Sequence, residues 1–83
     1  MKFTVVWKPR AENELTELWI AASDKNLVAH AAHQIDSELR DGPLEVGESR
    51  EGKFRILCVL PLVVSYEVIE ADCIVRVVRV RAI

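Results

Sequence analysis

Hydrophobic residues along this chain follow a β-strand period at both ends and a helical period in the middle. Apolar residues alternate over 2–7, and their β-favouring side chains predict a short strand. Pro9 ends this strand and suits the first turn of a helix. Apolar residues at helical spacing predict a helix over 9–22. Its expected buried stripe is Ala11, Leu15, Leu18, Trp19 and Ala22.

A second helix is predicted to start after Ser23 and Asp24, because both residues are good N-caps. Asp41-Gly42-Pro43 is expected to end it, since Gly42 suits a C-terminal cap and proline cannot continue the helix. The short connection predicts an antiparallel helix hairpin. The expected apolar face of this helix is Leu27, Val28, Ala31, Ile35 and Leu39.

Three β-type runs follow, at 54–60, 62–69 and 73–80, and their short connections predict an antiparallel meander. The whole chain, residues 1–83, is therefore expected to be one α+β domain of order β-α-α-β-β-β. Its helix hairpin is predicted to pack on one face of a four-stranded, mainly antiparallel sheet. Trp7 and Trp19 are expected to anchor the contact between sheet and helices.

The last two strands carry apolar residues on both faces, although a pair of short helices can cover only one face. In strand 73–80, Val75 and Val77 have one parity, whereas Ile74, Val78 and Val80 have the other. An antiparallel sheet with one solvated face alternates more strictly. The surplus predicts a partner on the second face, either a second copy or another chain. The alternative is that a few valines on this face are simply exposed to solvent and bind no partner.

Composition narrows the protein class. The chain has 83 residues, 51% hydrophobic and 29% charged, which is typical of a globular protein. Its net charge of −2 divides into −4 over residues 1–49 and +2 over 50–83, so only the second half favours nucleic acid. The N-terminus does not match a secretion signal, and no apolar run is long enough to span a membrane. The two cysteines, Cys58 and Cys73, fit a cytoplasmic protein with reduced thiols.

The chain resembles the RelE/ParE superfamily of bacterial toxins from toxin–antitoxin pairs. The resemblance rests on the order of VVWKPRAENELTELW, LRDGP, GESREGKFRIL, PLVVSYEV and VRVVRV over nearly all residues. It implies a cytoplasmic toxin that a cognate antitoxin holds inactive. RelE-like members cut mRNA in the ribosomal A site, and ParE-like members poison DNA gyrase. A degenerate, non-toxic member is a further alternative, because fold alone does not decide function.

For an RNA-cleaving member, the resemblance implies basic residues on the sheet and near the chain end. On this basis the predicted catalytic residues are Lys53, Arg55 and Arg81. The predicted substrate-binding residues are Arg50, Tyr66, Arg76, and Arg79. Leu62-Val63-Val64 stands where RelE-like nucleases usually carry an arginine, and neither tyrosine nor histidine follows Arg81.

Each of these residues also has a structural alternative. Lys53 and the nearby arginines could solvate a loop, with Arg50 pairing Glu48 or Glu51. Arg79 and Arg81 are expected to share a face opposite Arg76, where charges also discourage aggregation of a strand edge. Tyr66 could instead belong to the core. No motif indicates a metal or another cofactor, since His30 and His33 lack further ligands at zinc spacing.

Overall fold

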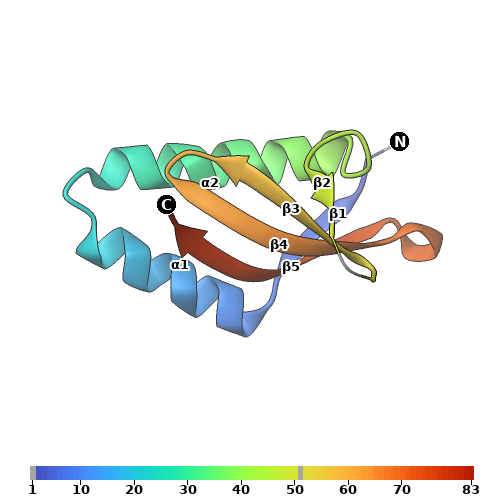
Figure 1. The fold of residues 1–83 in the computed structure, drawn as a ribbon, viewed down its shortest axis with the longest axis horizontal. Helices are drawn as coiled ribbons and strands as arrows, with labels where there is room; N and C mark the ends of the chain where they lie inside the picture. Colours follow the sequence, from blue (N-terminus) through green and yellow to red (C-terminus); the bar gives the residue numbers. More distant parts are fainter. Residues whose placement is uncertain (1, 51) are drawn as a thin grey trace.

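The computed structural model describes residues 2–50 and 52–83, and its elements follow the predicted order (Figure 1). The helices and long strands begin and end within two residues of their predicted bounds, a difference that is normal for element ends. They are β1 (Thr4–Trp7), α1 (Pro9–Ala21), α2 (Lys25–Asp41), β2 (Glu48–Ser49), β3 (Phe54–Val59), β4 (Leu62–Ile69), the 3-10 turn η1 (Glu70–Asp72) and β5 (Ile74–Ala82).

Within the described residues, one sheet has the strand order β1-β5-β4-β3-β2, so the prediction of four strands was wrong by one. The additional strand, β2, has only two residues and pairs antiparallel with β3 through Glu48 and Ser49. So short a strand has no hydrophobic period from which it could be predicted. The meander β3-β4-β5 is antiparallel as expected, and β1 pairs parallel with β5.

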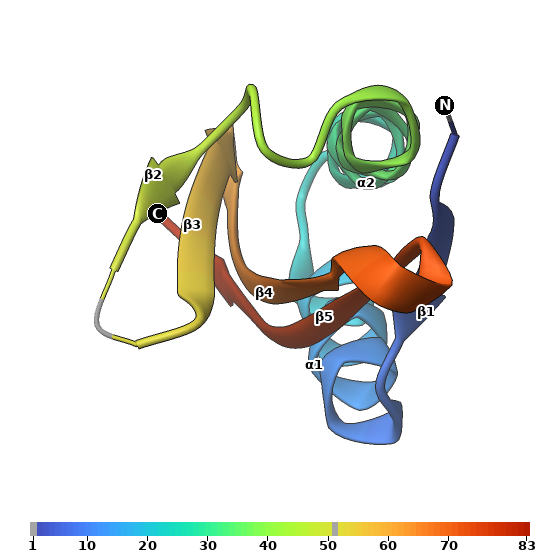
Figure 2. The ribbon, with the colours of Figure 1, turned by 90° about the vertical axis from the view of Figure 1, so that its right-hand side faces the viewer.

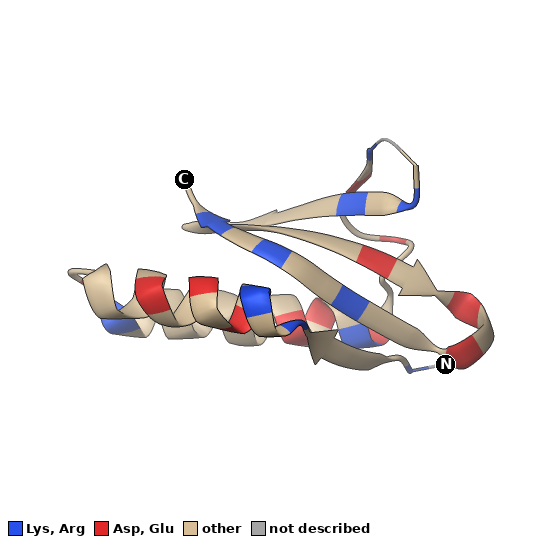
Figure 3. Ribbon diagram, turned by 90° about the horizontal axis from the view of Figure 1, so that it is seen from below, with Lys and Arg blue, Asp and Glu red and all other residues tan. Residues whose placement is uncertain are grey.

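Both α1 and α2 lie on one side of the sheet, which confirms the predicted layers (Figure 3). Seen end-on, the sheet is strongly twisted, with β1 and β2 at opposite edges (Figure 2). The core fills the space between the sheet and the helices. Its buried members include Ala11, Ile35, Leu39, Leu57, Leu62, Val64, Tyr66, Val75, Val77 and Val80. We call the other side of the sheet, which carries no helix, the open face. None of the described helices has the length and apolarity needed to cross a membrane.

The predicted role of the two tryptophans is only half right. Trp7 packs against the core, and its Nε1 donates a hydrogen bond to Asp36 Oδ1 at 3.2 Å. Trp19 is instead 43% exposed, and the Lys25 ammonium lies 5.4 Å from its ring centre. Leu27, predicted to be buried, is also exposed. Trp19 lines a hollow between α1 and α2, whereas Leu27 lies near the end of the sheet, beside Pro61 and Leu62.

A register shift between β4 and β5 corrects the predicted faces of β5. Ser65 pairs with Arg79, but the next residue, Tyr66, pairs with Val77, so Val78 is an extra residue on β5. Such a bulge reverses the alternation beyond it. Val75, Val77 and Val80 are therefore all buried on the helix side. The surplus of apolar residues on the open face is smaller than strict alternation predicts.

The same shift changes the positions of three arginines. Arg76, Arg79 and Arg81 pair with Glu67, Ser65 and Val63, which occupy alternate positions of β4. All three arginines consequently lie on the open side by register, and the prediction that Arg76 lies opposite the others was wrong. Figure 3 shows basic residues at intervals along β5, which ends at the C-terminus.

Asp24 caps α2 as predicted, since its Oδ1 accepts a hydrogen bond from the Leu27 backbone N–H at 3.1 Å. Replacing Asp24 with alanine is expected to lower the free energy of unfolding by about 1 kcal/mol, because one N–H at the helix start loses its acceptor. Urea denaturation followed by circular dichroism measures the difference. Ser23→Ala is the control and should change stability much less. Equal losses in the two variants would contradict the cap.

Candidate functional site

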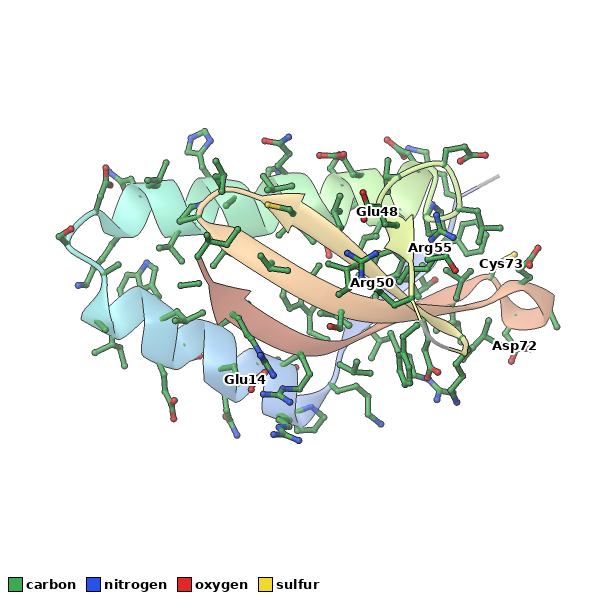
Figure 4. All side chains as sticks on the ribbon, viewed as in Figure 1. Glu14, Glu48, Arg50, Arg55, Asp72 and Cys73 are labelled. Atoms are coloured by element: carbon green, nitrogen blue, oxygen red, sulfur yellow. The ribbon has the colours of Figure 1, made fainter. Side chains whose placement is uncertain are left out.

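Arg50 follows β2 and lies beside the open face (Figure 4). Its Nη1 is 2.9 Å from Glu48 Oε2, which confirms this predicted partner. The alternative partner, Glu51, lies outside the described residues. With Ile56 and Cys58 it lines a shallow hollow of about 400 Å³. Both partners of this ion pair are well exposed, so the pair itself stabilises the loop by only about 0–1 kcal/mol.

Lys53 and Arg76 converge on Glu67, a residue that the sequence analysis did not single out. Lys53 Nζ lies 3.1 Å from Glu67 Oε2, and Arg76 Nη1 lies 3.2 Å from Oε1. The Glu67 side chain is only 7% exposed, and a buried carboxylate needs such partners to offset its lost hydration. The ion pairs tie β4 to β5 and to the residue preceding β3. The sequence did offer one signal for this contact, because Glu67 and Arg76 carry opposite charges on neighbouring strands of the predicted meander.

Arg55 and Tyr66 form a cross-strand pair on the helix side of the sheet. The Tyr66 hydroxyl donates to the Pro43 carbonyl oxygen at 2.8 Å and accepts from Arg55 Nε at 3.3 Å. Arg55 Nη2 donates to the Leu44 and Val46 carbonyl oxygens. Burial raises the pKa of Tyr66, an effect that the Arg55 charge partly offsets.

These hydrogen bonds give Arg55 and Tyr66 a structural role. Tyr66 is completely buried, which leaves no surface of its ring for a substrate. Arg55 uses its guanidinium to hold the segment that follows α2 against the sheet. Both residues therefore support the loop that leads to Arg50, rather than lying beside it on the open face.

Arg79 lies at the edge of β5 and is bound by Glu14 of α1. β1 pairs only with residues 74–77, so α1 lies beside the following part of β5. Glu14 Oε2 accepts from Arg79 Nε at 2.9 Å, and Oε1 accepts from the Val80 backbone N–H at 2.9 Å. One carboxylate therefore binds both a basic side chain and the backbone edge of β5. Figure 4 labels Glu14 on α1. The sequence contained no local sign of this contact, because the partners are 65 and 66 residues apart.

Arg81 is exposed near the end of β5, opposite Val63 of β4. Within residues 2–50 and 52–83, its side chain has no hydrogen-bond or ion-pair partner. It is thus the candidate cation with the most freedom to meet another molecule. Five of the seven predicted site residues lie on or beside the open face, and Arg55 and Tyr66 do not.

The basic side chains of the open face can bind anions, but several of them are already paired with carboxylates of the same chain. Lys53, Arg76 and Arg79 each already contact a carboxylate, whereas Arg81 does not. Guanidinium groups on one strand suit contacts with successive phosphates or with carboxylates of another chain. Half-buried Ile56, Val63, Ile69 and Ile74 share the open face with these charges by register and would add apolar contact area.

The hydrogen bonds of the Glu14 carboxylate are expected to make the stability of the protein depend on pH. The hydrogen bond from the Val80 N–H, together with Arg79, lowers the pKa of this carboxyl below its usual 4.5. A lowered folded-state pKa gives stability that is present above the unfolded-state pKa and is lost as the pH falls through the folded-state value. The stability difference between wild type and Glu14→Gln should therefore shrink below about pH 4.5. Denaturation at several pH values between 7 and 3 measures it, and a constant difference would contradict the assignment.

Neither a protein-family model nor a curated protein sequence matches this chain. Solved structures do match it. A chain of the toxin–antitoxin complex RelBE2 from Mycobacterium tuberculosis superimposes with a TM-score of 0.83 at 20% identity, over 100% of both chains. The chromosomal ParDE system of P. aeruginosa gives 0.76 at 12% identity, over 99% of this chain and 97% of that chain.

A mutant of the E. coli toxin RelE in the free state gives a TM-score of 0.75 at 17% identity, over 99% of this chain and 84% of that chain. At these identities the likeness establishes the arrangement of the backbone and not the chemistry of the side chains. The expected architecture is confirmed apart from the added short strand: this chain has the fold shared by the RelE and ParE toxin–antitoxin proteins.

Proposed function

We propose that this protein is the toxin component of a toxin–antitoxin pair and that a cognate antitoxin holds it inactive. The observation that carries the proposal is the superposition over the full length of both chains with a member of the RelBE2 complex. The mixture of half-buried apolar side chains and arginines on the open face is also suited to cover by another chain.

We further propose that the toxin inhibits translation by cleaving mRNA on the ribosome, as the resemblance to RelE-like members implies. Arg81 and Arg79 would contact phosphates, because cations stabilise the charge that develops on a phosphate during cleavage. Lys53 would contribute from its position just before β3, where Glu67 holds it. Arg55 would act indirectly, by holding the loop before Arg50 in place.

A protein that poisons DNA gyrase by contact is the second candidate. The observation that favours it is the pairing of Lys53, Arg76 and Arg79 with carboxylates of the same chain, which reduces their charge toward RNA. The likeness to the ParDE system is consistent with it. The open face would then bind protein rather than nucleic acid.

Controlled expression in a bacterial host tests these proposals. Wild type is expected to lower the viable count by at least about tenfold, and Arg81→Ala should restore growth because a phosphate contact worth about 1.5–3 kcal/mol is lost. Arg40→Ala is the matched control, since this arginine lies on α2 and forms an exposed ion pair with Asp36. Primer extension should show new mRNA ends only with wild type and the control.

The remaining outcomes separate the alternatives. Arrest by wild type and Arg81→Ala alike, without mRNA cleavage, would contradict the nuclease and support inhibition of gyrase by contact. No arrest by any variant would contradict an active toxin in that host. If a small adjacent gene encodes an antitoxin, co-expression of its product is expected to restore growth.

A further inference from the structure

We propose that Glu14 is a positioning residue: it fixes the guanidinium of Arg79 so that the terminal amino groups of this arginine meet an RNA phosphate. This role rests on the proposed nuclease function. It assigns a functional residue to α1, although every residue that the resemblance implied lies in the second half of the chain.

The hydrogen bonds around Arg79 support this role. Glu14 Oε2 binds the Nε atom of Arg79, at the inner side of the guanidinium. In the described part of the chain, the two terminal nitrogens of Arg79 have no acceptor, and the side chain is 33% exposed. A guanidinium held through Nε still presents a fork of N–H donors that matches two phosphate oxygens.

The backbone around Arg79 explains why a second residue is needed to fix it. Arg79 follows the extra residue Val78, at the point where the register between β4 and β5 shifts. Bulges re-aim side chains. On the side of β5 away from β4, no strand of the described residues pairs with Arg79. Glu14 binds both the Val80 backbone N–H and the Arg79 side chain, so a carboxylate bound through both oxygens orients the guanidinium relative to the strand.

The two contacts of Glu14 can be separated by one substitution. In Glu14→Gln, the amide oxygen can still accept from the Val80 N–H, whereas the amide nitrogen cannot accept from Arg79. The variant should still be fully folded under the assay conditions, with stability reduced at neutral pH only by the lost ion pair with Arg79. The charge of Arg79 remains, so RNA binding should persist, but its guanidinium is no longer held. Loss of placement affects the transition state more than the bound substrate.

Ribosome-dependent cleavage of a defined mRNA, with kcat and KM measured separately, tests the proposal. Glu14→Gln is expected to lower kcat by about 10–100-fold and to change KM by less than about threefold. Arg79→Ala should lower kcat at least as much. Adding Glu14→Gln to Arg79→Ala should cause no further loss, because both substitutions remove the same contact. Glu12→Gln, an exposed carboxylate of the same helix, is the matched control and should behave as wild type.

Three results would overturn the role. Wild-type kcat in Glu14→Gln would show that placement of Arg79 is not needed. A full additional loss in the double variant would show that Glu14 acts independently of Arg79. A kcat loss that only follows a fall in melting temperature would identify a structural residue. Absence of cleavage by wild type would instead refute the nuclease function itself, and this role with it.

Discussion

Tyr66→Ala is expected to lower the free energy of unfolding by about 3–5 kcal/mol, the loss typical of a large aromatic side chain removed from a core. Tyr66 is completely buried in the centre of β4, and its hydroxyl binds the loop after α2. The substitution removes the ring from the core and the anchor of that loop together. Urea denaturation at pH 7, followed by circular dichroism, measures the loss.

Tyr66→Phe separates the two contributions. The ring remains, but the Pro43 carbonyl oxygen loses its donor and Arg55 Nε loses its acceptor. The expected loss is about 1–2 kcal/mol, close to the contribution of one or two hydrogen bonds. Val63→Ala, on the open face of the same strand, is the control for a substitution in β4. A loss for Tyr66→Ala no larger than that of this control would contradict the packing described above.

Gly47→Ala is expected to cost about 2–4 kcal/mol, because strain and overpacking act at the same position. Gly47 has a φ of +71°, in the left-handed region that favours glycine. An added Cβ would lie 2.6 Å from the Ile56 carbonyl oxygen and 2.8 Å from the Tyr66 hydroxyl oxygen. Either the backbone before β2 or the Tyr66 side chain must then move. Thermal and urea denaturation both measure the loss.

Gly52→Ala is the matched control for Gly47→Ala. Gly52 has a similar φ of +64°, but an added Cβ would meet no atom within 4 Å among the described residues beyond its chain neighbours. Only the cost of the left-handed conformation remains, about 1 kcal/mol. The difference in stability between the two glycine variants therefore isolates the cost of the close approach to Ile56 and Tyr66. Equal losses would show that the close approach to Ile56 and Tyr66 does not limit this loop.

Much of the candidate site could be predicted from the sequence as a set of residue types, but not as a set of contacts. The resemblance placed basic residues on the sheet, and Arg50 pairs with Glu48 as one of two predicted partners. Glu67 and Glu14 were not singled out, although they bind Lys53, Arg76 and Arg79. Such pairs depend on which strands and helices become neighbours, and that information is distributed over the whole chain.

The sequence by itself determined the order and type of the long elements, the cap of α2 by Asp24 and the packing of helices on one side of the sheet. Hydrophobic periods and caps depend on residues within about one or two turns of each other, so they can be recognised locally. Only the tertiary structure decided the register shift at Val78, the open-side position of Arg76 and the bond from Glu14 to Arg79. One extra residue in a strand reverses every later side chain, and only contact with the neighbouring strand decides where it is accommodated.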